Sequence, residues 1–348
     1  MTDKNYFDWN MRSARKLEGA GEQDADDSTE VILLSDYEVP EFKILYEKIE
    51  GSHWVPEEIN YSGDASDWKV SIDEDTKTCV KQILTFFSQA DFLVVDIISL
   101  IEPHVKNCPY VHFYIIAQKA QEHVHAITYM KQIVALGLPQ RELQEIFQAF
   151  KKNPDIDAIA KFIEQEVSEA NSAGEIGKLI LIDAFVEGIL FQGAFAAIQW
   201  LRTKNVLKGV TKANEFITRD EGLHTEAICA MFKFLRQEYR TFADGFVNHL
   251  CDIFVGFADK IAADCIKVGL VGLTRDSMRQ YIRFHADIVL QMLGYEPLYN
   301  ASNPYESMVV SSMNQVIKTN FFEVESHYTG TSTDSVTKIA MLDEPIDC

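Results

Sequence analysis

The sequence of 348 residues has few of the features that mark secreted and nucleic-acid-binding proteins. Its six cysteines form no CxxC pair and no regular spacing, and the opening residues MTDKNYFDWN contain no apolar segment of a signal peptide. Basic residues are scarce, because 32 Lys and Arg stand against 53 Asp and Glu, which gives a net charge of -21. Such a chain is not expected to bind nucleic acid through its overall field. We therefore expect a cytoplasmic protein with free thiols.

Long apolar runs are also rare, and one stretch, residues 179–198, resembles a membrane span. It contains Asp183, Glu187 and Gln192, and an acid inside an apolar run is costly in lipid. In a soluble protein the same stretch is a buried helix, whose carboxylates must be paired or must hold a metal ion. We predict the buried helix and no association with membranes.

The rest of the chain shows no sustained strand alternation and has only nine prolines. From about residue 75 to about residue 295 the apolar residues follow a helical period. Breaks at 102–110, 137–140, 152–155, 171–175, 204–211 and 293–297 divide this region into helices. Residues 1–30 are predicted to form a flexible polar arm, residues 31–320 a helical domain, and residues 321–348 a flexible tail.

A Glu-x-x-His pair occurs twice in this helical region, as Glu122–His125 and as Glu221–His224. Positions i and i+3 share one helix face, with Cβ atoms about 5–6 Å apart, so each pair can bind a metal ion through a carboxylate and an imidazole. A single pair is often a surface salt bridge or a hydrogen bond. Two copies in otherwise apolar helices favour a metal site.

Each pair follows a further acid at a similar distance. Asp91 lies 31 residues before Glu122, and Glu187 lies 34 residues before Glu221, which predicts two similar helical hairpins. Ferritin-like dimetal carboxylate proteins use this arrangement. Four carboxylates and two imidazoles suit iron or manganese, and the carboxylates neutralise two divalent charges. We predict an all-α, ferritin-like bundle with a dimetal carboxylate site in its core.

Neighbouring acids and histidines fit this site less well. Asp96 lies about 140° around the helix from Asp91, so the two cannot share the site face. Asp183 is on roughly the same side as Glu187 and can replace it as a ligand, although the matching 31- and 34-residue spacings favour Glu187. Four other histidines show no partnering pattern: His104, His112, His249 and His285.

Tyr129 lies on the ligand face, four residues after His125 and seven after Glu122. It is either a core tyrosine bonded to a carboxylate or a redox group, because a dimetal centre that activates oxygen can oxidise a nearby phenol. The radical would survive only in a dry apolar pocket. Three residues that fall on the site faces can build it, although such residues are by default core: Phe191, Phe195 and Ile217.

From about Trp54 to Tyr328 the chain resembles the small, radical-generating subunit of class I ribonucleotide reductase. The strongest segments are HWVPEEI, FFSQAD, QEHVHAITY, AFVEGILFQGAFAAIQWL, ITRDEGLH and TNFFE. The resemblance implies two iron ions per chain, with manganese or a mixed pair left open, and a stable radical at Tyr129. It assigns the metal ligands to two sets: Asp91, Glu122 and His125 for one ion, and Glu187, Glu221 and His224 for the other.

The resemblance also implies a radical relay and a partner protein. Trp54 and Asp220 resemble relay residues, with Asp220 accepting a hydrogen bond from His125. Tyr328 resembles the tail tyrosine that passes the oxidising equivalent onward, although FFEVESHYTG is one residue shorter than the commonest pattern. A large catalytic subunit would bind the C-terminal tail through Ile339, Met341, Leu342 and Ile346. That subunit would reduce ribonucleoside diphosphates to deoxyribonucleotides for DNA synthesis. This chain would form a homodimer, and it shows no glycine loop for a nucleotide.

Two other functions remain compatible with a four-helix metal site. A ferritin-like dimetal oxidase or hydroxylase would lack the Trp54 relay and keep a substrate pocket at the metals. A metal-storage or assembly protein would need no Tyr129 and would load many ions per chain.

Overall fold

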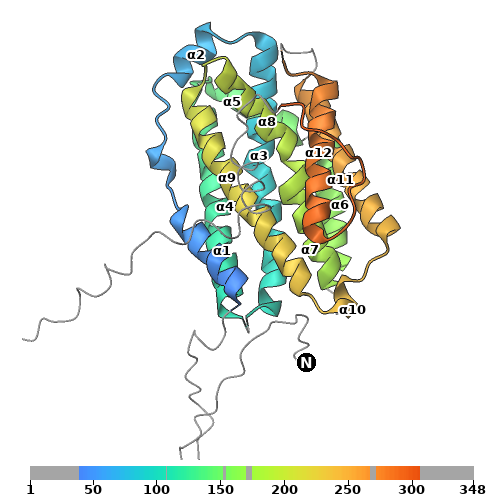
Figure 1. Cartoon of the computed structure of the whole chain (residues 1–348). Helices are drawn as coiled ribbons and strands as arrows, with labels where there is room; N and C mark the ends of the chain where they lie inside the picture. The colour runs from blue at the N-terminus through green and yellow to red at the C-terminus, as the bar shows by residue number, and fades with distance from the viewer. Residues whose placement is uncertain (1–38, 107, 152–153, 170–174, 267–271, 306–348) are drawn as a thin grey trace, which may run out of the picture.

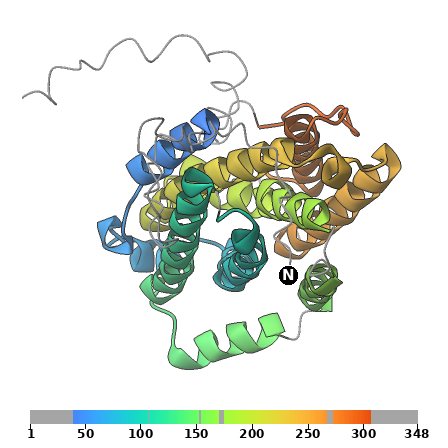
Figure 2. The same cartoon turned by 90° about the horizontal axis from the view of Figure 1, so that it is seen from below.

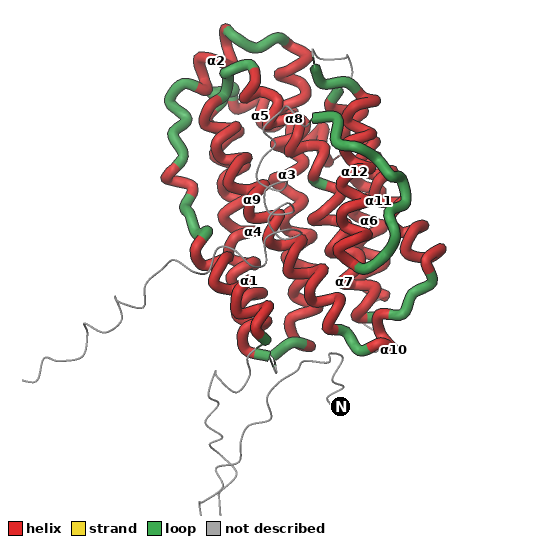
Figure 3. The backbone as a smooth tube through the Cα atoms, in the orientation of Figure 1, coloured by secondary structure: helices red, strands yellow, loops and turns green. Residues whose placement is uncertain are grey.

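The computed structural model of the chain describes residues 39–305, except 107, 152–153, 170–174 and 267–271. The described residues form α-helices and short helical turns, and no β-strand element is present among them (Figure 3). The predicted arm 1–30 and tail 321–348 lie outside the described residues, as do Tyr328 and the predicted docking residues Ile339, Met341, Leu342 and Ile346.

The central bundle consists of α3 (Glu74–Ile101), α4 (Pro109–Ala135), α9 (Lys208–Phe234) and an interrupted helix. The interrupted helix comprises α7 (Ile176–Phe185), a π-helix (Val186–Leu190) and α8 (Gln192–Thr203). Helix α3 packs on α4, and α9 packs on α4, α7 and α8. Figures 1 and 2 show these long helices running side by side around a common interior.

Shorter helices cover this bundle (Figure 1). Helix α1 (Pro40–Gly51) packs on α4 and α9, and α2 (Asp64–Val70) packs on α9. Helices α11 (Asp244–Cys265) and α12 (Arg275–Leu293) cover the interrupted helix. The remaining elements are α5 (Gln140–Lys151), α6 (Pro154–Glu169), α10 (Gln237–Arg240) and the 3₁₀ turns Pro56–Glu58 and Glu102–His104.

Each predicted break lies at a helix boundary, but the sequence reading missed the end of α9 at Phe234 and the break between α11 and α12. Helical structure also begins earlier than residue 75. Helix α1 buries Phe42, Leu45 and Ile49, which lie three and four residues apart on one face. That face is short, and the polar residues between its members hide the period in the sequence.

Within the described part of the chain, two helices are long and apolar enough to cross a membrane by length and composition, and both pack in the bundle. Residues Ile176–Thr203 contain such a window that is 100% buried, and Glu74–His104 contain one that is 65% buried. The prediction of a buried helix over 179–198 is therefore confirmed. Five cysteines of the described chain are buried and form no disulfide: Cys79, Cys108, Cys229, Cys251 and Cys265.

The N-terminus of α9 is held by carboxylates from α2. Asp64 accepts hydrogen bonds from the backbone N–H groups of Gly209 (3.0 Å) and Val210 (2.9 Å). Asp67 accepts one from the N–H of Leu207 (2.9 Å), which has a left-handed φ of 49°. Free N–H groups at a helix start need such acceptors. These contacts fix the position of the helix that carries Glu221 and His224.

The π-helix gives Glu187 its position in the core. Its wider turn frees a backbone carbonyl, and the Gln192 side chain donates a hydrogen bond to the carbonyl of Glu187 (3.1 Å). Gly188 lets neighbouring helices approach, because a Cβ there would lie 2.4 Å from Val289 Cγ2 and 3.0 Å from Thr225 Cγ2. A regular helix was predicted here; the π turn is a departure from it, and such turns are frequent at functional sites.

Candidate metal centre

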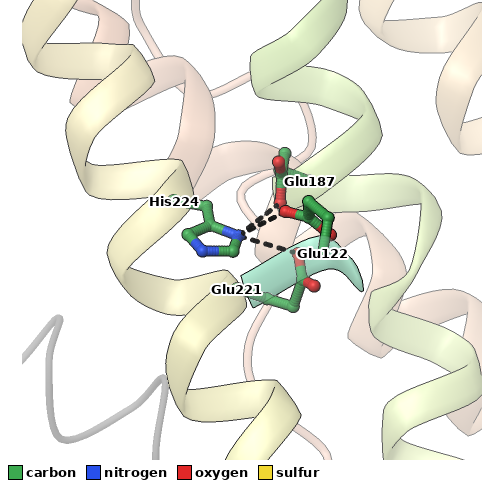
Figure 4. Close-up of side chains that lie close together, drawn as sticks. All are labelled: Glu122, Glu187, Glu221 and His224. Atoms are coloured by element: carbon green, nitrogen blue, oxygen red, sulfur yellow. Dashed lines mark ion pairs between the residues drawn. The ribbon is translucent and has the colours of Figure 1, made fainter. Parts of the chain in front are cut away.

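Six side chains from four segments meet in the core of the bundle. Glu122, Glu187, Glu221 and His224 each offer one ligand atom within 4.8 Å of the others (Figure 4). A second such group consists of Asp91 on α3 together with Glu122 and His125, which lie one turn apart on α4. All six residues are at most 1% exposed. Asp183 is also fully buried, but neither group includes it.

Glu122 and Glu221 each lie between the two imidazoles. Nδ1 of His224 is 2.9 Å from Glu122 Oε1 and 3.7 Å from Glu221 Oε2. Nδ1 of His125 is 3.5 Å from Glu122 Oε2 and 3.1 Å from Glu221 Oε1. Each carboxylate thus turns one oxygen toward each histidine, which is the placement of a bridging ligand. Glu187 lies at the His224 end, with Oε2 3.5 Å from Nδ1 of His224.

Most polar atoms that face the interior of the cluster lack hydrogen-bond partners although they are fully buried. This holds for both oxygens of Glu122 and Glu221, for Asp91 Oδ2 and Glu187 Oε2, and for the Nδ1 atoms of His125 and His224. Unpaired polar atoms are costly in an apolar core. Burial raises the pKa of Asp91, as does the negative charge of Glu122. Burial and the Glu221 carboxylate likewise raise the pKa of Glu187.

The pKa values of both histidines are raised as well, although burial acts on an imidazole in the opposite direction. Burial would lower the pKa of His224, but the Glu122 and Glu187 carboxylates outweigh it and raise that pKa well above its usual value. The cluster thus holds an excess of negative charge that attracts positive charge. Two divalent cations satisfy the orphaned atoms and balance four carboxylates, so the donor set fits a dimetal site.

Trp54 and Asp220 lie together on the outer side of His125. The Trp54 indole donates a hydrogen bond to Asp220 Oδ2 (2.7 Å), and His125 Nε2 lies 3.3 Å from the same oxygen. The Trp54 and His125 rings are stacked at 6.3 Å between centroids. Although burial opposes it, hydrogen bonds and charge from His125, with Arg219 and Trp54, lower the pKa of Asp220. An ionised Asp220 therefore fixes His125 as the Nε2–H tautomer and leaves Nδ1 free for a metal.

Tyr129 is 1% exposed and its hydroxyl has no hydrogen-bond partner, so the interpretation of a tyrosine bonded to a carboxylate does not describe it. Its ring stacks on Phe87 (4.8 Å, 14°), and Phe87 stacks in turn on Phe195 (4.7 Å, 20°). Phe191 contacts Phe87 edge-on at 6.0 Å. Ile217 is fully buried on α9, one turn before Glu221. The Tyr129 ring is thus buried against Phe87, which in turn contacts Phe191 and Phe195.

Sequence reasoning missed Phe87, which is the ring in direct contact with Tyr129. A signal was present, because Phe87 lies one turn before Asp91 and therefore on the ligand face of α3. It also missed Gln118, which donates a hydrogen bond to Glu187 Oε1 (2.9 Å). Among the histidines set aside, His112 pairs with Glu102 (3.1 Å), and His285 is buried without a partner.

Comparison with known proteins decides the family. The sequence pattern of "Ribonucleotide reductase, small chain" matches residues 31–304. The chain belongs to this family. It is 32% identical to the ribonucleoside-diphosphate reductase small chain of African swine fever virus (isolate Tick/Malawi/Lil 20-1/1983), over 82% of this chain and 86% of the viral one. The family predicted from the motifs, its enzyme class and the helical ferritin-like fold are therefore confirmed.

Solved structures of small subunits share the fold. The Rnr4 homodimer of Saccharomyces cerevisiae superposes with a TM-score of 0.70 at 26% identity, over 80% of this chain and 86% of that one. The dimanganese(II) NrdF of Streptococcus sanguinis gives a TM-score of 0.70 at 20% identity, over 83% of this chain and 99% of that one. As a small subunit of ribonucleotide reductase, this chain works with a large subunit.

Proposed function

We propose that the metal centre of this small subunit generates a radical at Tyr129, which the large subunit uses to reduce ribonucleoside diphosphates. The observation that carries the proposal is the pair of ligand groups that share Glu122, with a buried phenol one turn beyond His125 on the same helix. Asp91, Glu122 and His125 would hold one ion, and Glu187, Glu221 and His224 the other. Two iron ions would supply, with oxygen, the power to oxidise Tyr129.

Tyr129 has the environment that a persistent phenoxyl radical needs. Burial raises the pKa of its phenol well above the usual value, and the Asp91 and Glu221 carboxylates add to the effect. The phenol therefore keeps its proton at neutral pH, so oxidation must remove one electron and one proton together. The stack of Phe87 and Phe195 excludes water and reductants from the ring. Phe191 and Ile217 complete the apolar surroundings in this proposal.

Trp54 and Asp220 form the proposed link between the metal centre and the loop after α1, in which Trp54 lies. In each turnover an electron would reach Tyr129 from the large subunit by way of Tyr328 and Trp54. The 2.7 Å hydrogen bond from the indole to Asp220 gives the Trp54 proton an acceptor when the ring is oxidised. Proton and electron can then move in step, which keeps the relay neutral in the low-dielectric core.

Iron is the proposed metal, and the structure-based match to a dimanganese protein keeps manganese as the other candidate. We place the protein in the cytoplasm, in line with its buried thiols, which form no disulfide.

The C-terminal tail is proposed to dock on the large subunit. An unlabelled peptide of residues 339–348 should compete for that subunit, and a peptide without effect would contradict tail docking.

A homodimer is proposed on the basis of an apolar stripe along α4. Four large side chains are well exposed there, from 44% to 68%: Ile116, Ile127, Met130 and Val134. At 100° per residue they fall within about 60° of one another around the helix. A pocket of about 370 Å³, lined in part by Phe113 and Ala120, continues the stripe. Exposed apolar area of this extent is typical of an interface between chains.

Electron paramagnetic resonance tests the proposed function. The apoprotein is loaded with ferrous iron and oxygen, and its spectrum is compared with that of Tyr129→Phe. A tyrosyl signal at about two iron ions per chain that disappears in the variant supports the proposal. Iron uptake far above two per chain would indicate storage, and iron oxidation without a tyrosyl signal would indicate an oxidase.

A further inference from the structure

The two histidines of the metal centre have different partners on their outer nitrogens. His125 Nε2 faces the Asp220 carboxylate, whereas His224 Nε2 lies 2.9 Å from the amide oxygen of Gln121. Gln121 is 4% exposed and directly precedes Glu122 in α4. One imidazole is therefore paired with an anion and the other with a neutral amide.

Ser52 determines which way the Gln121 amide points. The Ser52 hydroxyl donates its single proton to the backbone carbonyl of Ile49 (2.8 Å), so its oxygen can only accept a second bond. The amide nitrogen of Gln121 supplies that bond at 3.1 Å. The amide oxygen must then face His224, whose Nε2 carries the proton and donates it. This chain of donors makes Nδ1 of His224 the nitrogen that faces the carboxylates and would bind a metal ion.

Ser52 is also connected, through Arg219, to the half of the centre that contains His125. Its backbone carbonyl accepts a hydrogen bond from Arg219 Nη2 (2.5 Å). The Arg219 guanidinium donates twice to Asp220 Oδ1, from Nε (3.1 Å) and from Nη2 (2.9 Å). Asp220 Oδ2 then accepts the bonds from Trp54 and His125. A continuous series of hydrogen bonds thus joins the outer nitrogens of both histidines through one residue at the end of α1.

We propose that Gln121 and Ser52 are positioning residues, which orient His224 and couple it through Arg219 to the Asp220–His125 pair. The inference rests on the proposed metal centre. The short segment Ser52–Trp54 would then help to position both imidazoles, and it carries the Trp54 indole as well. Partners of metal-binding histidines typically change metal affinity by about 10- to 100-fold when removed.

Cobalt(II) titration of the metal-free protein under anaerobic conditions tests the proposal. Visible absorption reports each bound ion and its ligand geometry. Gln121→Leu removes the acceptor at similar volume, and we expect one of two cobalt ions to bind about 10- to 100-fold more weakly, with an altered spectrum. Gln121→Glu keeps an acceptor and should hold both ions with wild-type affinity or better. Gln132→Leu is the matched control, since Gln132 is buried on the same helix and belongs to neither ligand group.

A double-mutant cycle tests the coupling. Ser52→Ala should weaken the same ion as Gln121→Leu, by a smaller factor, and it carries the test if the leucine variant does not fold. The combined effect of Gln121→Leu and Arg219→Met should differ at least about threefold from the product of the single effects, since the two residues share one network. Wild-type affinity and spectrum in both Q121L and S52A would overturn the positioning role, and multiplicative effects would overturn the coupling. A wild-type chain that binds no cobalt would instead contradict the proposed metal centre itself.

Discussion

The two halves of the metal centre share a ligand pattern and differ in almost everything around it. In the first half, Asp91 projects from the uninterrupted helix α3, and His125 is backed by the charged pair Asp220 and Arg219. In the second half, Glu187 projects from a π turn, and His224 is backed by a neutral amide. Similar sequence spacings, 31 and 34 residues, therefore produce two ligand groups with different chemical surroundings. The proposed radical relay lies on the charged half.

The largest effect on metal affinity is expected at the carboxylate that the two halves share. Glu122 belongs to both ligand groups, so Glu122→Gln should weaken both metal ions by at least about 100-fold, more than loss of an outer partner does. Asp91→Asn is the matched control, because it should weaken one ion strongly and the other little. Calorimetric titration with manganese(II) would show the difference. Loss of a single ion in Glu122→Gln would mean that Glu122 does not bridge.

Gly188→Ala tests the π-helix, which only the second half of the centre contains. A Cβ at this position would lie 2.4 Å from Val289 Cγ2, so we expect a loss of about 1–3 kcal/mol of unfolding free energy from overpacking. Gly256→Ala on α11 is the control, since nothing lies within 4 Å of a Cβ there and it should be neutral or stabilising. Denaturant unfolding measures both. Equal stabilities would show that the π turn tolerates a side chain.

His285 on α12, which packs against the π-helix, should make stability depend on pH. Burial lowers the pKa of His285 to about 3, so the unfolded chain takes up its proton first as the pH falls. This contribution is present at neutral pH and is lost below about pH 6.5, by roughly 2 kcal/mol between pH 7 and pH 5. In His285→Leu the slope of stability against pH should be smaller by that amount. Parallel pH profiles for the two proteins would contradict this.

The smallest effect on stability is expected from the N-terminal caps of α3 and α9, two helices that carry metal-site residues. Helix α3 is capped locally, since Asp73 accepts a hydrogen bond from the N–H of Thr76 (2.7 Å), whereas α9 is capped from a distance by Asp64. Asp64→Ala should cost about 1–2 kcal/mol, and the exposed Asp73→Ala about 0.5–1 kcal/mol. Thermal melts of both variants check the order. A reversed order would show that burial adds nothing to the cap.

The ligand pattern could be predicted because it is local. A Glu-x-x-His pair must share a helix face whatever surrounds it, and the repeated spacing selects Asp91 and Glu187 as companions. All six side chains do meet in the structure. That they bind iron, and that Tyr129 holds a radical, stay predictions, as does the part assigned to Tyr328.

The surroundings of the ligands could not be predicted in the same way. Ser52 and Arg219 meet across 167 residues of sequence, and Asp64 and Gly209 across 145. Such contacts depend on how α1 and α2 pack on the bundle, which no short pattern encodes. The π turn was invisible as well, because it changes the register of a helix without changing its apolar composition.

The π turn amounts to one extra residue wound into an otherwise regular helix. Deleting a single residue between positions 186 and 190 would restore an ordinary winding, and the side chains on either side of the turn would keep their faces, because the π turn absorbs the extra residue locally. Phe195 beyond the turn and Asp183 before it would stay in place, while Glu187 within the turn would lose its present position. One deletion would thus separate the metal ligand from the aromatic shield over Tyr129.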